Sequence, residues 1–262
     1  MRGKVSDAGP TRVSERLDIC LVQDTDLLRV WLYTGQSDRM VVSFTGIGVE
    51  GEDLGYEFAK TATQNGRDSA LFIADKTRSW LNAPGIIEEI RQWIDAFRVE
   101  TGARDVMTLG HSMGGFAALA MPKYTPVKVA VGLSPQVSVH PDVVADDPRW
   151  MDYRNRINSF AIRDVSETLV RDTRYFVVHG RHSREAPQRD RFPRADNLVH
   201  LILPRTVHNV PQKLRRAGLL SSVVELAFQN RPRKLRHTMA GLDVYRRPPP
   251  DALPDDQNRV AR

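Results

Sequence analysis

The sequence VMTLGHSMGGFAALA at residues 106–120 combines an apolar run typical of a strand, a serine between glycines, and an alanine-rich run typical of a helix. Its centre, Gly110-His111-Ser112-Met113-Gly114, matches G-x-S-x-G, the pattern of a serine on a sharp strand-to-helix turn. Glycines on both sides relieve clashes in such a turn, and the following helix N-terminus favours a developing negative charge. We therefore predict that Ser112 is a nucleophile; an ordinary turn without chemistry is the alternative.

Around this stretch, short apolar runs alternate with segments of helical spacing. We expect strands at residues 18–22, 27–33, 40–44, 70–73, 106–109, 127–133, 175–180 and 198–203. We expect helices at residues 54–65, 85–100, 210–217 and 219–229. The first two strands are close enough to form an antiparallel hairpin, and the remaining alternation predicts an α/β fold with a mostly parallel sheet and helices on both faces. Ligands of such sheets bind beyond the carboxyl ends of the strands.

The chain divides by composition into three parts. We predict a flexible basic N-terminus at residues 1–16, a domain at 17–230 with a small helical cap inserted at about 139–170, and a basic proline-rich tail at 231–262. The net charge of +6 comes from the ends, because residues 17–230 hold equal numbers of acidic and basic side chains. A neutral fold argues against nucleic-acid binding. We expect a solvated tail, and the alternative is a tail that contacts an acidic surface.

Bulk features limit the location of the protein. No apolar stretch reaches 18 residues, so we expect no membrane-spanning helix. The first residues lack the apolar segment of a secretory signal, which predicts a cytoplasmic protein. The single cysteine, Cys20, stands in an apolar run, and we expect it to be a small buried core residue.

A serine hydroxyl needs a base within hydrogen-bond reach to act as a nucleophile. Of the seven histidines, only His208 lies just after the last predicted strand, on the loop that enters a helix, and it is our candidate base. The alternative for His208 is a polar residue at a helix N-terminus. We expect His111 to point away from Ser112, and His179 to be a buried core residue with satisfied hydrogen bonds.

The order of these residues resembles the α/β-hydrolase superfamily over residues 17–230. Residues 44–48 (FTGIG), 75–80 (DKTRSW) and 132–136 (GLSPQ) are further similar to bacterial hydrolase-like proteins, some of them linked to surface polysaccharide. The resemblance implies an α/β-hydrolase fold with a small helical cap. It also implies a serine hydrolase that cleaves an ester or thioester of a small or acylated substrate through an acyl-enzyme.

The resemblance implies an acidic residue shortly after the penultimate strand, but Ser183 stands where the acid is usual. Glu185 is our first candidate and Asp190 the second; Asp142 is a third, if the acid follows the preceding strand instead. The absence of any third member remains open at this point. A surface salt bridge is the alternative for each of these carboxylates.

The resemblance also implies two oxyanion donors, the backbone N–H of Met113 and that of Gly46 or Ile47. We find no metal-ligand spacing and no phosphate-binding glycine loop, so we expect no metal and no cofactor. An acyltransferase is one alternative function. A non-catalytic binding or assembly protein is another, and Ser183 in the position of the acid supports it.

Two further groups of residues have open interpretations. Lys76, Arg78 and Trp80 follow a strand, and they either line the pocket or form a solvated loop. Within the cap, we expect a partner-free surface helix, with a charged lid over the site as the alternative. The residues concerned are Arg149, Trp150, Tyr153, Arg154 and Arg156.

Overall fold

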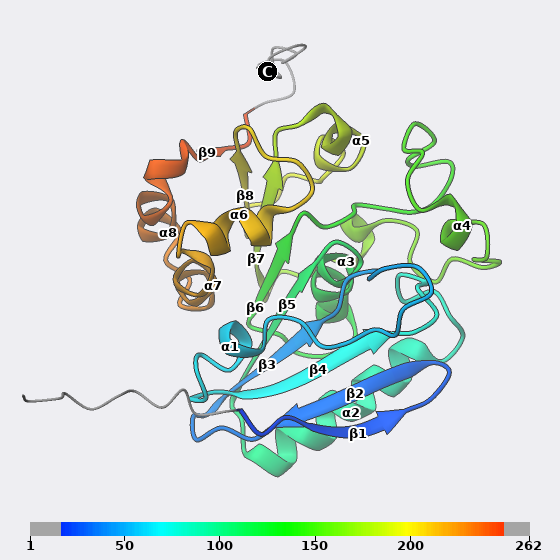
Figure 1. Ribbon diagram of the computed structural model, residues 1–262, viewed down its shortest axis with the longest axis vertical. Coiled ribbons are helices and arrows are strands. Elements are labelled where there is room, and N and C mark those ends of the chain that lie inside the picture. Colours follow the sequence, from blue (N-terminus) through cyan, green and yellow to red (C-terminus); the bar gives the residue numbers. More distant parts are fainter. Residues whose placement is uncertain (1–16, 249–262) are drawn as a thin grey trace, which may run out of the picture.

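A nine-stranded sheet runs through residues 17–248, which are the residues that the computed structural model describes (Figure 1). The strands are β1 (Cys20–Asp24), β2 (Leu28–Tyr33), β3 (Arg39–Phe44), β4 (Ser69–Asp75), β5 (Asp105–His111), β6 (Val129–Leu133), β7 (Arg174–Gly180), β8 (Leu198–Leu203) and β9 (Tyr245–Arg246). Their order in the sheet is β1-β2-β4-β3-β5-β6-β7-β8-β9. The predicted basic N-terminus, residues 1–16, lies outside the described residues.

Strand directions agree with the α/β prediction. Strands β1 and β2 form the expected antiparallel hairpin at one edge, and β2 is also antiparallel to β4. From β4 through β3 to β8 all neighbours are parallel. Because β4, β3, β5, β6, β7 and β8 all end at the same edge, the loops that follow them meet there.

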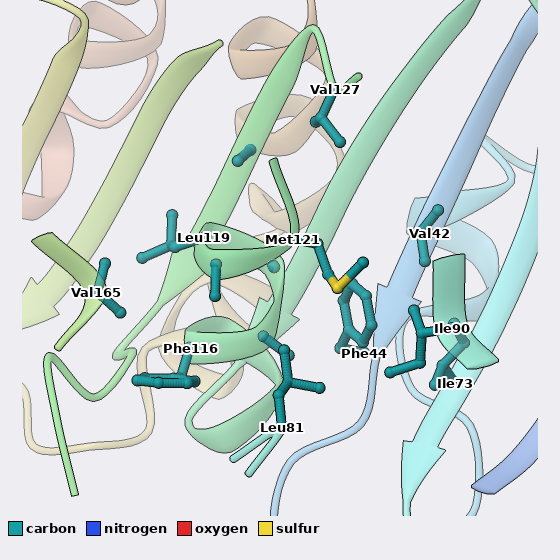
Figure 2. Close-up of a cluster of buried hydrophobic side chains, with 14 of the residues drawn as sticks. Val42, Phe44, Ile73, Leu81, Ile90, Phe116, Leu119, Met121, Val127 and Val165 are labelled. Carbon is teal, nitrogen blue, oxygen red and sulfur yellow. The ribbon is translucent and has the colours of Figure 1, made fainter. Parts of the chain in front are cut away.

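Helices cover both faces of the sheet. On one face, α2 (Ile86–Thr101) and α3 (Met113–Ala120) pack on a cluster that includes Val42, Phe44 and Ile73, as Figure 2 shows. On the other face lie α1 (Ala59–Ala62), α6 (Val210–Arg216), α7 (Leu220–Phe228) and α8 (Pro232–Thr238). Each fully buried side chain of this size contributes about 1.5–3 kcal/mol, so the two apolar layers hold the sheet edge in a fixed shape.

Helix α2 follows its apolar spacing closely. Ile86, Ile90, Ile94 and Phe97 recur every three or four residues and are all buried. Gly102 ends the helix with φ +64°, a left-handed conformation that glycine adopts without strain. The prediction for this helix and its end is therefore confirmed.

The helix expected at residues 54–65 is wrong, because only Ala59–Ala62 is helical. Hydroxyls of the preceding strand bind the carbonyls of this segment: Ser43 Oγ donates to the Glu57 carbonyl and Thr45 Oγ1 to the Gly55 carbonyl. Such side-chain bonds give the backbone an alternative to helical hydrogen bonds. The apolar spacing instead reflects the burial of Leu54 and Phe58 against the sheet.

The inserted segment at about 139–170 is mostly irregular rather than helical. It contains the short helix α4 (Met151–Arg154) and a single 3-10 turn, Val165–Thr168. Arg154 organises it, since its guanidinium donates to the carbonyls of Val139, Asp147 and Val144. A buried guanidinium that binds carbonyls can fix a loop that has little secondary structure of its own.

The ordered chain continues past residue 230, where we had expected the tail to begin. Helix α8 packs against α7, and β9 adds an antiparallel strand beside β8 (Figure 1). Leu235 and Met239 are buried, so apolar contacts hold this part in place. The rest of the expected tail, residues 249–262 with most of the proline run, lies outside the described residues.

Two further expectations concern the burial of Cys20 and the presence of membrane-spanning helices. Cys20 is exposed on the edge strand β1, not buried, because an edge hairpin has one uncovered side. None of the helices between residues 17 and 248 is long and apolar enough to cross a membrane.

Candidate active site

Ser112 stands at the turn between β5 and α3. Its backbone has φ +56° and ψ −123°, a conformation that costs a non-glycine residue on the order of 1–3 kcal/mol. A Cβ on Gly110 would lie 2.0 Å from the Gly114 carbonyl oxygen, and one on Gly114 would lie 2.2 Å from that of Phe44. The glycines of the motif are thus required by close backbone approach, and the tight turn leaves the serine at the sheet edge.

Three side chains form a continuous line of hydrogen bonds at this edge. The Ser112 hydroxyl donates to His208 Nε2 over 2.8 Å, and His208 Nδ1 donates to Glu185 Oε2 over 3.0 Å. Glu185 is almost fully buried, and the His208 side chain is 28% exposed. A hydroxyl, an imidazole and a buried carboxylate in this order can pass a proton from serine to histidine.

The position of the acid has a local explanation. After β7 the chain makes a 3-10 turn, Ser183–Glu185, before helix α5 (Ala186–Arg189) begins. This turn brings the carboxylate of Glu185, rather than the side chain of Ser183, to His208. The other two candidates bond elsewhere: Asp190 pairs with Arg189, and Asp142 is exposed beside Arg163.

Glu185 has a second partner in the inserted segment. Arg149 Nη1 lies 2.6 Å from Glu185 Oε1, so each carboxylate oxygen has its own donor. Burial alone would raise the pKa of Glu185, but the hydrogen bond to His208 and the charges of His208 and Arg149 lower it to about 2. The group is therefore ionised throughout the neutral range.

The inserted segment also covers the histidine. The Trp150 ring lies 5.6 Å from the His208 ring and 6.2 Å from the Trp80 ring, centroid to centroid. The Arg149 guanidinium lies 4.4 Å from the Trp150 centroid. The alternative of a charged lid thus describes Arg149 and Trp150 better than a surface helix without partners.

His111 has a role that the sequence pattern does not reveal. Its Nε2 donates to the backbone carbonyl of His208 over 3.1 Å, and the two rings lie 4.9 Å apart. Burial and the neighbouring His208 lower the pKa of His111 to about 4, so this ring is neutral at physiological pH. It fixes the backbone that carries His208.

The predicted oxyanion donors differ in whether their backbone N–H already has a hydrogen-bond partner. The Gly46 N–H is engaged by the carboxylate of Glu57, and burial raises the pKa of Glu57 to about 7 despite this bond. Among residues 17–248, the N–H groups of Ile47 and Met113 have no hydrogen-bond partner. Of the pair Gly46 or Ile47, the structure thus favours Ile47 as a free donor.

Behind the site lies a chain of buried histidines. Arg247 donates to His200 Nδ1, so His200 Nε2 must carry the proton that it shares with His179 Nδ1, 2.9 Å away. His179 Nε2 in turn donates to the Pro135 carbonyl over 2.9 Å. Burial lowers the pKa of both rings and keeps them neutral. The expectation of a satisfied core residue at His179 is confirmed.

The strand order, the strained serine after β5, and a histidine after β8 define an α/β hydrolase of the serine type. A family model described as "Putative esterase" matches residues 46–200, more than half of the chain, and the chain belongs to this family. No curated protein matches the sequence.

Solved structures share the fold at low sequence identity. A capsule O-acetyltransferase of Neisseria meningitidis serogroup A has a TM-score of 0.56 at 13% identity, covering 77% of this chain and 92% of that chain. An esterase of Pyrococcus furiosus has a TM-score of 0.54 at 15% identity, covering 87% and 95%. Est1E from Butyrivibrio proteoclasticus has a TM-score of 0.53 at 12% identity, covering 85% and 99%. At these identities the similarity to solved structures shows the fold alone. The family match shows that the chain is an enzyme of the esterase type.

Proposed function

We propose that Ser112, His208 and Glu185 act as a catalytic triad that hydrolyses an ester or thioester through an acyl-enzyme. The observation that carries this proposal is the unbroken line of hydrogen bonds from the Ser112 hydroxyl to the Glu185 carboxylate. The ionised Glu185 keeps the proton of His208 on Nδ1, which leaves Nε2 free to accept the serine proton.

The reaction proceeds in two halves. Ser112 Oγ attacks the acyl carbon while His208 takes its proton, and the N–H groups of Met113 and Ile47 bind the oxyanion. His208 then protonates the leaving group. In the second half His208 takes a proton from water, and the hydroxide formed attacks the acyl-enzyme and releases the acid.

An acyltransferase is the second candidate, and the enclosure of the serine favours it. Ser112 is only 3% exposed, and Trp150 lies against His208. A site that excludes water can let an alcohol take its place in the second half-reaction. The third alternative, a non-catalytic protein, loses its main support because Glu185 lies within hydrogen-bond distance of His208.

Partners and location are further parts of this proposal. We infer a small or acylated substrate and a cytoplasmic location, and no nucleic-acid partner because residues 17–230 are neutral overall. A contact between the basic tail and an acidic surface is the alternative, and it would involve residues 231–248, where six of the eight basic side chains of the tail lie.

The test is hydrolysis of p-nitrophenyl esters of several chain lengths by the protein and by Ser112→Ala. We expect the variant to lose at least roughly a thousandfold in kcat/KM, because removal of the nucleophile eliminates the covalent route. Ser166→Ala, on the exposed surface of the inserted segment, is the matched control and should retain full activity. Labelling of folded protein by a fluorophosphonate should require Ser112; unlabelled protein would contradict the mechanism.

A further inference from the structure

The hydroxyl of the proposed nucleophile contacts a glutamine side chain as well as His208. Gln136 follows β6, is fully buried, and its Nε2 donates to Ser112 Oγ over 3.1 Å. We propose that Gln136 is a further catalytic residue, whose amide N–H stabilises the serine oxygen when it leaves the acyl-enzyme. This inference rests on the proposed function of Ser112.

The orientation of the amide is fixed by Trp80. The indole Nε1–H donates to Gln136 Oε1 over 3.0 Å, and an indole nitrogen can only donate. Turning the amide over would set two donors against each other at Trp80. The Gln136 amide nitrogen, not its oxygen, must therefore face Ser112.

Trp80 is itself held by a strained loop. Trp80 and Leu81 have φ values of +51° and +62°, a region that bulky side chains rarely adopt. The buried Asp75 carboxylate compensates, since its Oδ2 accepts from the Ser79 N–H, the Ser79 hydroxyl and the Leu81 N–H. Strained backbone that the surroundings hold in place is typical of functional sites.

The backbone of Gln136 is fixed as firmly as its side chain. On one side, the Pro135 carbonyl accepts the hydrogen bond from His179. On the other, the Val137 N–H donates to Gln188 Oε1 over 2.8 Å. Ser134, two residues earlier, has φ +44° and is a second strained position. Two strained segments thus converge on one amide at Ser112.

The chemistry of this contact differs between the two half-reactions. Before acylation the N–H already bonds the free Ser112 hydroxyl, so it stabilises the ground state and the transition state together and changes this barrier little. In the acyl-enzyme, Oγ is an ester oxygen and a weaker acceptor. During deacylation the bond between the acyl carbon and Ser112 Oγ breaks, its electron pair moves to Oγ, and His208 returns a proton to that oxygen. A donor already aimed at Oγ stabilises this charge, as an oxyanion donor does at the carbonyl oxygen.

The test separates the two half-reactions. With p-nitrophenyl acetate in a stopped-flow instrument, the initial burst reports acylation and the later linear phase reports deacylation. For Gln136→Met, which keeps the length and removes the N–H, we expect deacylation to slow roughly tenfold and acylation to change less than threefold. KM should fall together with kcat because the acyl-enzyme accumulates, and intact-protein mass spectrometry should detect it.

Two further variants test whether the effect of Gln136→Met comes from the lost N–H rather than from misfolding. Gln136→Glu keeps the acceptor for Trp80 and removes the donor to Ser112, so it should also slow deacylation selectively. Trp80→Phe keeps an aromatic ring but frees the amide to turn, and a smaller effect in the same direction is expected. Thermal melting of each variant reports whether it folds.

The outcomes are distinct. If acylation and deacylation slow by the same factor, Gln136 only positions the serine; if neither changes, the contact has no catalytic role. Either result overturns the proposal for Gln136 while fluorophosphonate labelling of Ser112 leaves the proposed function standing. Parent protein that is neither labelled nor active overturns both.

Discussion

The two edges of the parallel sheet differ in which residue types adopt left-handed backbone conformations. At the carboxyl edge, glycines such as Gly48 and Gly85 have positive φ, but so do six residues for which this conformation is costly: Arg78, Trp80, Leu81, Ser112, Ser134 and Arg205. At the amino edge they fall on Asn65, Gly66, Gly102 and Asn230, with Gln64 the exception. Asparagine and glycine adopt this region readily. Costly backbone conformations are thus concentrated at the edge that carries the proposed nucleophile.

Polar groups follow the same division. At the amino edge, buried Asp68 pairs with Arg39 and Arg67, and Arg39 also pairs with Glu225. A cleft of about 580 Å³ opens there, but its lining charges include these pairs, and such pairs offer no reactive group. The carboxyl edge also holds an ion pair, Arg149–Glu185, but there Trp80 donates to Gln136 and Gln136 donates to Ser112. Of the two edges, the carboxyl edge thus adds neutral donors that end at the proposed nucleophile.

The largest contrast should come from one glutamate at each edge. For Glu185→Gln we expect roughly a thousandfold loss of kcat with esters, because the amide can no longer stabilise the imidazolium of His208. Glu225→Gln, which weakens an ion pair at the amino edge, should leave kcat unchanged. Steady-state rates at saturating ester measure both, and similar losses in the two variants would contradict the comparison.

Glycine-to-alanine variants at the two edges should separate the cost of a steric clash from the cost of a left-handed φ. In Gly114→Ala the new Cβ meets the Phe44 carbonyl oxygen at 2.2 Å, so we expect a loss of about 3 kcal/mol in the free energy of unfolding. In Gly102→Ala the new Cβ meets nothing within 4 Å, and only the left-handed φ costs about 1 kcal/mol. Urea unfolding followed by tryptophan fluorescence measures both. Equal losses would show that the turn at Ser112 can relax.

The smallest effect concerns pH and Glu57, beside the loop that carries Ile47. Burial raises the pKa of Glu57 to about 7 in the folded protein, above the 4.5 of an unfolded glutamate. The folded state therefore holds the proton more tightly, and the protein loses stability as pH rises from 4.5 through 7. Glu57→Gln does not titrate, so between pH 5 and 8 it should gain roughly 1–2 kcal/mol relative to the parent. Urea unfolding at each pH tests this, and parallel curves would contradict it.

The sequence predicts the elements of this site that depend on neighbours along the chain. Ser112 lies within a local pattern of glycines, and His208 follows the last parallel strand, so both could be found without coordinates. The acid stayed open among three residues because a 3-10 turn moves it past the usual position. Such a one-turn change leaves no periodic signal.

Contacts between distant segments were beyond prediction. Arg149 reaches Glu185 only because Arg154 folds the inserted segment, and Gln136 reaches Ser112 only through Trp80. The expected helix at residues 54–65 is absent for a related reason, since the hydroxyls of Ser43 and Thr45 bind its carbonyls. Tertiary hydrogen bonds override local spacing in all three cases.

The histidine chain behind the site has a consequence for the order in which the protein matures on the ribosome. Ser112, Glu185 and His208 all leave the ribosome before Arg247, whose guanidinium fixes the tautomer of His200 and, through His179, the hydrogen bond to Pro135. A nascent chain that has exposed the whole triad still lacks this support. Chains grow from the N-terminus at about 5–20 residues per second, so the last piece of the site is added after its reactive groups are in place. An emerging chain would then lack the full support of its serine until Arg247 has left the ribosome.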